Sequence, residues 1–393
     1  MYERDWKNLS EIDQKAVDNF REYIRIPSVH PNVNYEPCVT FLEALAKDVG
    51  LDVNVYRSVP KNPVVVLTWT GTEPKLSSIA LNSHMDVVPV YEENWKRKPF
   101  DAEVDDNGDI YARGAQDAKN FGIQYVEAIR RLKLEGRKLK RTVHVLFVPD
   151  EETGGGNGMQ KFVQSDEFKK LNVGFALDEG RASSDGTLMA YYGEKLIWIF
   201  AVHCFGTTGH GSLFLSDTSG EKAQRFLERL YNFRATQTND DVTVNLTILK
   251  GGVHSNVVPG KITMVFDTRS PTHKFDSFKA SVLQWCNEAG ANVTIETYSK
   301  NENVENTKVD ETNPFWMTLK AATENLGFPM QVGILSANTD ARFLRAVGVP
   351  TIAFNCNRYT AKRSHGDNEY LNINVFLDGI TIYKEIIAGI SNI

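Results

Sequence analysis

The chain has 393 residues, of which 41% are hydrophobic and 24% charged, and its formal net charge is -6. A chain of this length exceeds what one hydrophobic core usually holds, so we expect two domains. The acidic balance and the lack of a Lys/Arg-rich run argue against nucleic acid or an anionic membrane as the main partner.

The N-terminal residues are charged and lack the apolar core of a signal peptide, and no apolar run approaches the roughly 18 residues of a membrane-spanning helix. The cysteines are scattered, without the paired spacing of a metal site: Cys38, Cys204, Cys286 and Cys356. We therefore expect free thiols and a cytoplasmic protein.

Helical and strand-like patterns alternate over the first part of the chain. An apolar stripe at helical spacing runs from Ser10 to Ile26, with Ser10 as the expected N-cap and Pro27 as the stop. A second helical pattern ends at Gly50. Three strand-like runs and a further helix then follow, at 52–56, 64–69, 79–82 and 123–134.

The third strand-like run leads directly into His84 and Asp86. In an extended chain, residues two apart share one face, so one can bind a metal while the other fixes the histidine tautomer. A histidine after a strand is also often purely structural, and this stretch alone leaves both interpretations open.

The strand predicted at 142–148 ends in three consecutive carboxylates, Asp150, Glu151 and Glu152, followed by glycines. Adjacent acids repel one another, and no basic residue lies within several positions to offset them. A bound metal cation is the physical candidate for the missing positive charge, because it is often the largest local charge in a site. A solvated acidic turn is the alternative.

Two more acids extend the pattern. Asp117 begins the helix at 123–134, where it could also serve only as a helix cap. Glu179 follows another short apolar run, 173–177. Because ligands collect at the carboxyl ends of strands in open α/β sheets, the convergence of these residues favours a metal site.

Strands dominate from about residue 188 to 305, in the order strand, helix, strand, strand, helix, strand. This order is typical of a ferredoxin-like α+β unit. The last part of the chain returns to the first pattern, with helices at 314–326 and 377–387 and apolar runs at 331–335, 346–349 and 351–354. We predict one discontinuous α/β domain, residues 1–188 and 307–393, with an inserted α+β domain at 189–306.

Six motifs in this order resemble those of the co-catalytic zinc peptidases and amidohydrolases, a family of aminoacylase, carboxypeptidase and dipeptidase type. They are Ser83–Val90, Tyr111–Asp117, Phe147–Gly154, Phe175–Gly180, Gly251–Pro259 and Ser364–His365. The resemblance covers essentially the whole chain. Met85 departs from it, where the family usually has a small or polar residue, and so does the basic pair Lys362-Arg363.

The resemblance implies a zinc-exopeptidase-like α/β domain that holds two zinc ions. His84 and Glu179 would bind one metal, Glu152 and His365 the other, and Asp117 both. Zinc with three protein ligands and a water is the pattern of a catalytic site. Two such metals generate a bridging hydroxide and polarise the substrate carbonyl.

The resemblance also assigns roles beyond the ligands. Glu151 would carry the proton as general base and acid, and Asp86 would orient His84. The inserted lid domain would mediate homodimerisation and bring His210 to the partner's site as an oxyanion donor. Residues suited to substrate binding are Asn256, Arg269 and Arg342. The Asp117–Ala118 peptide is expected to be cis.

Together with these residues, the resemblance implies a cytoplasmic, zinc-dependent enzyme. Its substrates would be small molecules, N-acyl-L-amino acids, which it would hydrolyse to a carboxylate and a free amino acid. A metallo-dipeptidase or carboxypeptidase of the same superfamily is the alternative, since it would share every metal ligand. A non-catalytic binding protein on the same scaffold would need a lost ligand or base, and the sequence lacks none.

Overall fold

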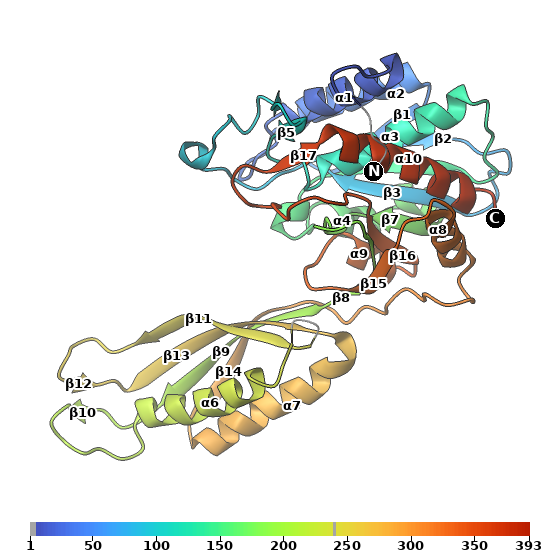
Figure 1. Cartoon of the computed structure of the whole chain (residues 1–393). Helices are drawn as coiled ribbons and strands as arrows, with labels where there is room; N and C mark the ends of the chain where they lie inside the picture. Colours follow the sequence, from blue (N-terminus) through green and yellow to red (C-terminus); the bar gives the residue numbers. More distant parts are fainter. Residues whose placement is uncertain (1–4, 239–240) are drawn as a thin grey trace. The chain divides into compact units, whose positions relative to one another are not determined.

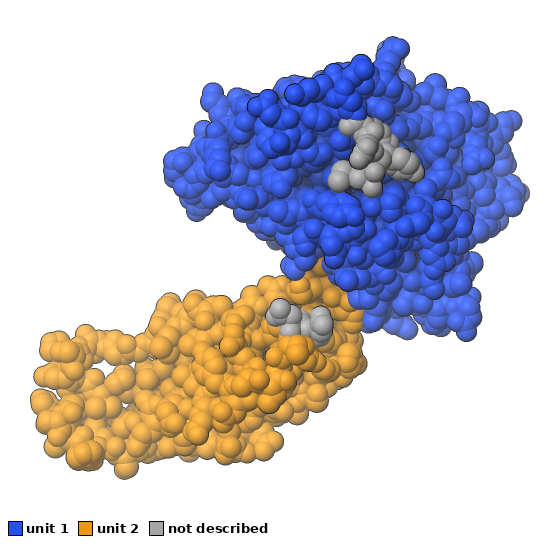
Figure 2. All heavy atoms as spheres, viewed as in Figure 1, with its two compact units in different colours: residues 1–193, 305–333, 339–393 blue, residues 194–304, 334–338 orange. Residues whose placement is uncertain are grey.

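The computed structural model describes residues 5–238 and 241–393, which form two compact units (Figure 2). Unit 1 holds residues 1–193, 305–333 and 339–393. Unit 2 holds residues 194–304 and 334–338. Within the described part of the chain, no helix is long and apolar enough to cross a membrane.

An eight-stranded mixed sheet organises unit 1, in the order β1-β2-β6-β3-β7-β16-β8-β15 (Figure 1). Its strands are β1 (Asp52–Val59), β2 (Asn62–Trp69), β3 (Ser78–His84), β6 (Val143–Val148), β7 (Val173–Asp178), β8 (Leu188–Glu194), β15 (Met330–Leu335) and β16 (Thr351–Asn355). The four central strands, β6, β3, β7 and β16, run parallel to their neighbours within that group. Parallel strands bring their carboxyl ends to one edge, and that edge carries the site.

Helices cover both faces of this sheet. One face packs against α1 (Glu11–Ile24), α2 (Glu36–Val49), α3 (Lys119–Leu134), α8 (Pro314–Asn325) and α10 (Ile373–Ile390). The other face packs against α4 (Met159–Phe162), α5 (Asp166–Leu171) and α9 (Ala341–Ala346). Leu81 faces the first group and Ala80 the second, because successive side chains of a strand point to opposite faces. The result is a three-layer α/β/α unit.

The predicted helix signals act as expected in α1 and α2. The Ser10 side chain caps α1 by accepting a hydrogen bond from the Asp13 amide. Gly50 ends α2 in the left-handed conformation that glycine adopts without strain. A small sheet of β4 (Glu103–Val104), β5 (Asp109–Tyr111) and β17 (Tyr370–Asn372) joins a loop before α3 to the segment before α10.

Unit 2 is an antiparallel sheet in the order β11-β13-β9-β14, with two helices. Its elements in chain order are β9 (Leu196–Phe205), β10 (Gly209–His210), α6 (Ser219–Arg234), β11 (Thr243–Gly251), β12 (Val257–Val258), β13 (Lys261–Ser270), α7 (Thr272–Ala289) and β14 (Val293–Lys300). The helices bury Phe226 and Phe278 with Phe266 of the sheet in a separate hydrophobic core. The topology is that of a ferredoxin-like unit.

Three segments show what local patterns leave open. The apolar run at 346–349 is the end of α9 and the turn after it, whereas the runs at 331–335 and 351–354 form strands. The stretch before β7 forms two short helices, α4 and α5. The strand, helix, strand, strand, helix, strand order begins with β9, and β8 before it pairs with β16 of the large sheet.

Candidate metal centre

The candidate site lies at the carboxyl edge of three adjacent strands. His84 ends β3, Glu151 and Glu152 follow β6, and Glu179 follows β7. Asp117 immediately precedes the α3 segment, and His365 lies in the loop between β16 and β17. The Asp117–Ala118 peptide is cis, as predicted.

The carboxylate of Asp117 lies between the two histidines. Its Oδ1 is 3.1 Å from Nε2 of His84, and its Oδ2 is 3.2 Å from Nε2 of His365. On the first side, Nε2 of His84 is also 3.4 Å from Oε1 of Glu179. On the second side, Nε2 of His365 is 2.9 Å from Oε2 of Glu152. One carboxylate therefore offers one oxygen to each of two His/Glu pairs.

Negative charge is crowded at this edge. Burial, together with the nearby Glu179, raises the pKa of Glu151 well above its usual range. Burial and Asp117 do the same to the pKa of Glu179. Hydrogen bonds that its imidazole donates to Asp117 and Glu152 raise the pKa of His365 to about 10. Carboxylates that resist ionisation and an imidazole that resists losing its proton both indicate a place for cations.

The donor set fits a divalent metal such as zinc. Ligand atoms of His84, Asp117 and Glu152 all lie within 4.8 Å of one another. Oε1 of Glu152 is buried and has no hydrogen-bond partner among the described residues, so a metal would satisfy it. Imidazole nitrogen and carboxylate oxygen are ligands that zinc takes in catalytic sites.

The three consecutive acids do not act alike. Asp150 has a left-handed backbone, and its carboxylate accepts hydrogen bonds from Thr153 Oγ1 at 2.5 Å and from the Asn157 amide at 2.7 Å. The Asp150 carboxylate is therefore engaged by its own loop. Glu151 is nearer the ligands, but its Oε2 is 4.0 Å from Nε2 of His84, a longer distance than that from the same nitrogen to the carboxylates of Asp117 or Glu179.

Asp86 reaches His84 differently from the sequence prediction. The Nδ1 of His84 lies 2.8 Å from the main-chain oxygen of Asp86, whereas the nearer carboxylate oxygen is 3.8 Å away. The backbone carbonyl of Asp86 therefore accepts the hydrogen bond from Nδ1 of His84. The Asp86 carboxylate instead accepts from the amides of Glu151 at 3.3 Å and Glu152 at 3.0 Å. It holds the loop that carries both acids.

Arg342 is on the first turn of α9 and is anchored to the site loop. Its guanidinium donates to the carbonyl oxygens of Gly154 and Thr339, each at 2.8 Å.

Met85, which departs from the family pattern, is fully buried in the main hydrophobic core, so it packs inward and does not line an open site.

The remaining predicted residues are in unit 2. The short pairing of β10 with β12 sets His210 opposite Val257, next to Asn256, and the Asn256 carbonyl accepts from Gly211 at 2.7 Å. His210 is exposed, with Nδ1 2.7 Å from the Ser212 hydroxyl. Arg269 on β13 forms a two-point ion pair with Asp267, at 2.8 and 3.0 Å.

Sequence reasoning missed three residues that contact the site: His30, which is partly buried, and Arg113 and Glu369, which are buried. His30 belongs to no motif, and Arg113 lies within the motif Tyr111–Asp117, from which the sequence analysis singled out only Asp117. Glu369 carried a further hint, because it is an acid four residues after His365 in a loop that contains a candidate ligand.

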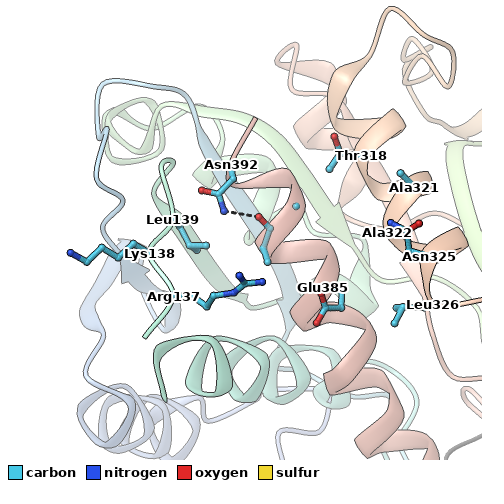
Figure 3. A pocket seen from close by; sticks show the side chains of 12 residues that line it. Arg137, Lys138, Leu139, Thr318, Ala321, Ala322, Asn325, Leu326, Glu385 and Asn392 are labelled. Carbon is cyan, nitrogen blue, oxygen red and sulfur yellow. Dashed lines mark hydrogen bonds between the residues drawn. The ribbon is translucent and has the colours of Figure 1, made fainter. Parts of the chain in front are cut away.

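A cavity of about 540 Å³ in unit 1 is lined by α8, the end of α10 and residues 137–139 (Figure 3). Residues 137–139 precede β6, so the cavity is at the amino end of that strand, and it shares no residue with the metal centre. The carboxyl edge of the sheet therefore remains the site that the chemistry supports.

Comparison with known families gives a match to peptidase family M20/M25/M40 over residues 80–389. The chain is 42% identical to aminoacylase-1A of Rattus norvegicus and 41% identical to aminoacylase-1 of Homo sapiens. Each alignment covers 98% of this chain and 97% of the relative. Aminoacylase-1 of Dictyostelium discoideum is 37% identical, with 97% and 98% covered.

Solved structures share the fold at low identity. A tripeptidase from Staphylococcus aureus superposes with a TM-score of 0.74 at 20% identity, covering 96% of this chain and 98% of that one. An M20 family metallo-carboxypeptidase from Sulfolobus solfataricus has a TM-score of 0.70 at 18% identity, with 98% and 100% covered. These similarities establish the architecture.

Proposed function

The chain belongs to peptidase family M20/M25/M40, and on this premise we propose that it is a zinc-dependent aminoacylase. It would hydrolyse N-acyl-L-amino acids to a carboxylate and a free L-amino acid. The observation that carries the proposal is the similarity to proteins named aminoacylase over nearly the full length of both chains. The arrangement of His84, Asp117, Glu152, Glu179 and His365 is consistent with it.

The proposed cofactor is a pair of zinc ions. His84 and Glu179 would hold one, Glu152 and His365 the other, and Asp117 would bridge them, which the split contacts of its two carboxylate oxygens support. When bound, the metals would supply a water of lowered pKa and polarise the scissile carbonyl. Three ligand carboxylates contribute about -3 against +4 from two zinc ions, which nearly balances the charge.

Glu151 is proposed as the group that moves protons. It is beside the ligands and is held farther from His84 than the ligand carboxylates are. Its raised pKa, caused first by burial, suits a carboxylate that must accept a proton and then release it. It would take a proton from the attacking water and deliver it to the leaving nitrogen. Asp86 would keep Glu151 in place through the backbone amides.

Unit 2 is proposed to mediate a homodimer and to supply His210 to the partner's site. The exposed imidazole, flanked by Gly209 and Gly211, is consistent with a donor that reaches across an interface. Asn256 is next to it and would line the same surface. Arg269 is a weaker candidate for substrate binding than Arg342, because its guanidinium is already paired with Asp267.

The proposed compartment is the cytosol. Its support is that all four cysteines are free thiols in the structure and each is buried. Burial raises the pKa of the Cys286 and Cys356 thiols to about 12, so neither is a reactive thiolate.

A substrate panel tests the activity. Purified protein loaded with Zn²⁺ is assayed with N-acetyl-L-amino acids, long-chain N-acyl amino acids and dipeptides. An aminoacylase hydrolyses the acylated amino acids with the highest kcat/KM. If dipeptides are cleaved better, the protein is the related metallo-dipeptidase, and if nothing is cleaved although zinc is bound, the hydrolase assignment is wrong.

A further inference from the structure

Two ligand loops from distant parts of the chain meet at the metal centre. Asp117 belongs to the loop before α3, and His365 to the loop before β17. Arg113 and His365 are 252 residues apart in the sequence, yet they are hydrogen-bonded. Two residues that bind one metal must be held at a fixed separation, so the side chains that connect the Asp117 loop to the His365 loop bear on metal binding.

Glu369 organises the loop that carries Asp117. Its side chain is completely buried. Oε1 accepts from the amides of Gln116 at 2.6 Å and Asp117 at 3.2 Å. Oε2 accepts from the Gly114 amide at 3.1 Å and from Nη1 of Arg113 at 2.7 Å. One carboxylate thus accepts hydrogen bonds from three backbone amides of one short loop, the last of them the amide of the predicted bridging ligand.

Arg113 connects the same carboxylate to the loop that carries His365. Its side chain is only 2% exposed. Nη1 donates to the carbonyl of Gly366 at 3.1 Å, and Nη2 donates to the carbonyl of His365 at 3.3 Å. His365 has a left-handed backbone with a φ of 62°, which a non-glycine residue adopts only when its surroundings hold it there. The guanidinium supplies such a constraint.

We propose that Arg113 and Glu369 are a positioning pair that fixes Asp117 relative to His365 and thereby sets the affinity for the metal they share. This inference rests on the proposed function, because it assumes that these two residues bind metal. Neither member of the pair is one of the five proposed metal ligands. The pair acts through main-chain atoms of the ligand residues, so its effect should appear in metal binding before it appears anywhere else.

A matched control exists in the same unit. Glu127 and Arg130 form another buried ion pair on α3, at 2.8 Å, and Glu127 is fully buried like Glu369. Glu127 is eight residues beyond the first residue of α3, or about 12 Å along that helix. A substitution there disturbs a buried charge of the same kind without touching either ligand loop.

The experiment measures zinc binding by the full-length apo-protein, by titration against a competing chelator. In Glu369→Gln, an amide nitrogen would face either Arg113 or the backbone amides, so a favourable contact becomes a repulsive one. We expect the weaker zinc-binding step to lose about 10–100-fold in affinity, the range for groups that support metal ligands. Arg113→Lys keeps the positive charge but loses the two-nitrogen guanidinium that bonds both the carboxylate and the His365 loop. It should cause a smaller loss of affinity in the same zinc-binding step.

Each outcome is decisive. If wild type binds no zinc, the proposed function fails by itself. If wild type binds two zinc ions and Glu369→Gln binds them equally well, the positioning pair is overturned. It is also overturned if Glu127→Gln weakens zinc binding to the same extent, since the effect would then be general destabilisation. Should Glu369→Gln fail to fold, the same comparison is made with Arg113→Lys, and unchanged affinity there overturns the proposal.

Discussion

Nε2 of His30 is 2.8 Å from Oδ2 of Asp86, which is itself completely buried. The same oxygen accepts the amide of Glu152 at 3.0 Å, and the other oxygen accepts the amide of Glu151. The Asp86 carboxylate is thus bonded to the His30 imidazole on one side. On the other side it fixes the backbone of Glu151 and Glu152. The main-chain oxygen of Asp86 meanwhile accepts a hydrogen bond from Nδ1 of His84.

Replacement of His30 should therefore reduce turnover without removing metal. In His30→Ala, Asp86 loses its side-chain partner and the Glu151–Glu152 loop gains freedom. We expect kcat/KM to fall by about 10-fold, the lower end of the range for supporting groups, while zinc content stays at the wild-type value. His30→Gln retains a donor and should recover most of the activity. Equal losses in both variants would contradict a hydrogen-bonding role.

Glu151→Gln should bind zinc normally and lose most of its activity. The substitution removes a proton carrier and leaves all five proposed ligands, and general acid–base groups typically contribute ~10²–10⁴-fold to rate. Metal content and kcat are measured on the same preparation. Glu152→Gln serves as the comparison, because it removes a ligand and should lose zinc as well. Loss of zinc from both variants would show that Glu151 is also a ligand.

His210 can be tested by mixing two inactive chains. In a two-fold dimer of His210→Ala and Glu151→Gln chains, one site carries both defects and the other carries neither. Random pairing of equal amounts makes about half of the dimers mixed, so activity should rise to roughly a quarter of wild type. Subunit exchange is verified separately with tagged chains. Exchange without recovery of activity would exclude a role for His210 across the interface.

Acid should destabilise unit 1 through His144 on β6. Burial lowers the pKa of this imidazole to about 4, and Nδ1 is 2.9 Å from the Thr68 hydroxyl. Between about pH 6.5 and 4 the unfolded chain binds the proton more readily than the folded chain, so stability falls as the pH falls. Over the whole interval, this shift of the His144 pKa lowers the free energy of unfolding by roughly 3 kcal/mol.

The measurement compares thermal unfolding at pH 7 and pH 4.5, with chelator present so that metal loss does not contribute. The midpoint temperature of unfolding should fall further in wild type than in His144→Asn, because asparagine at position 144 does not titrate in this range. An equal fall in the two proteins would show that His144 is not responsible.

Local signals predicted much of the fold. The Ser10 cap, the stop at Gly50 and the apolar runs of β3, β6 and β7 depend on residues near in sequence, and all are in the structure. The pattern of the run at 346–349 did not decide its structure, because a short apolar stretch can end a helix as well as form a strand. The assignment of β8 to the large sheet depends on its pairing with β16, which no local pattern contains.

In the site, too, motifs in the sequence predicted some features, and contacts between distant segments determine the others. Family motifs placed His84, Asp117, Glu152, Glu179 and His365 in one site, and the structure brings them within a few ångströms. The contacts of His30 and of the Arg113–Glu369 pair could not be predicted in this way, because each depends on side chains that meet only after the sheet has formed. The same limit explains Asp86, whose carboxylate was expected at the His84 ring but contacts backbone amides.

The strand order also has a consequence for biosynthesis. In the sheet, β16 lies between β7 and β8, although all of unit 2 is made between β8 and β16. While the ribosome makes unit 2, β7 presents an unpaired edge that could bind another chain. His365 follows β16 in the chain, so a complete set of ligands exists only after unit 2, β16 and the loop beyond it have all been made. Metal loading is therefore expected to follow synthesis, and zinc supplied to a nascent chain should not direct its folding.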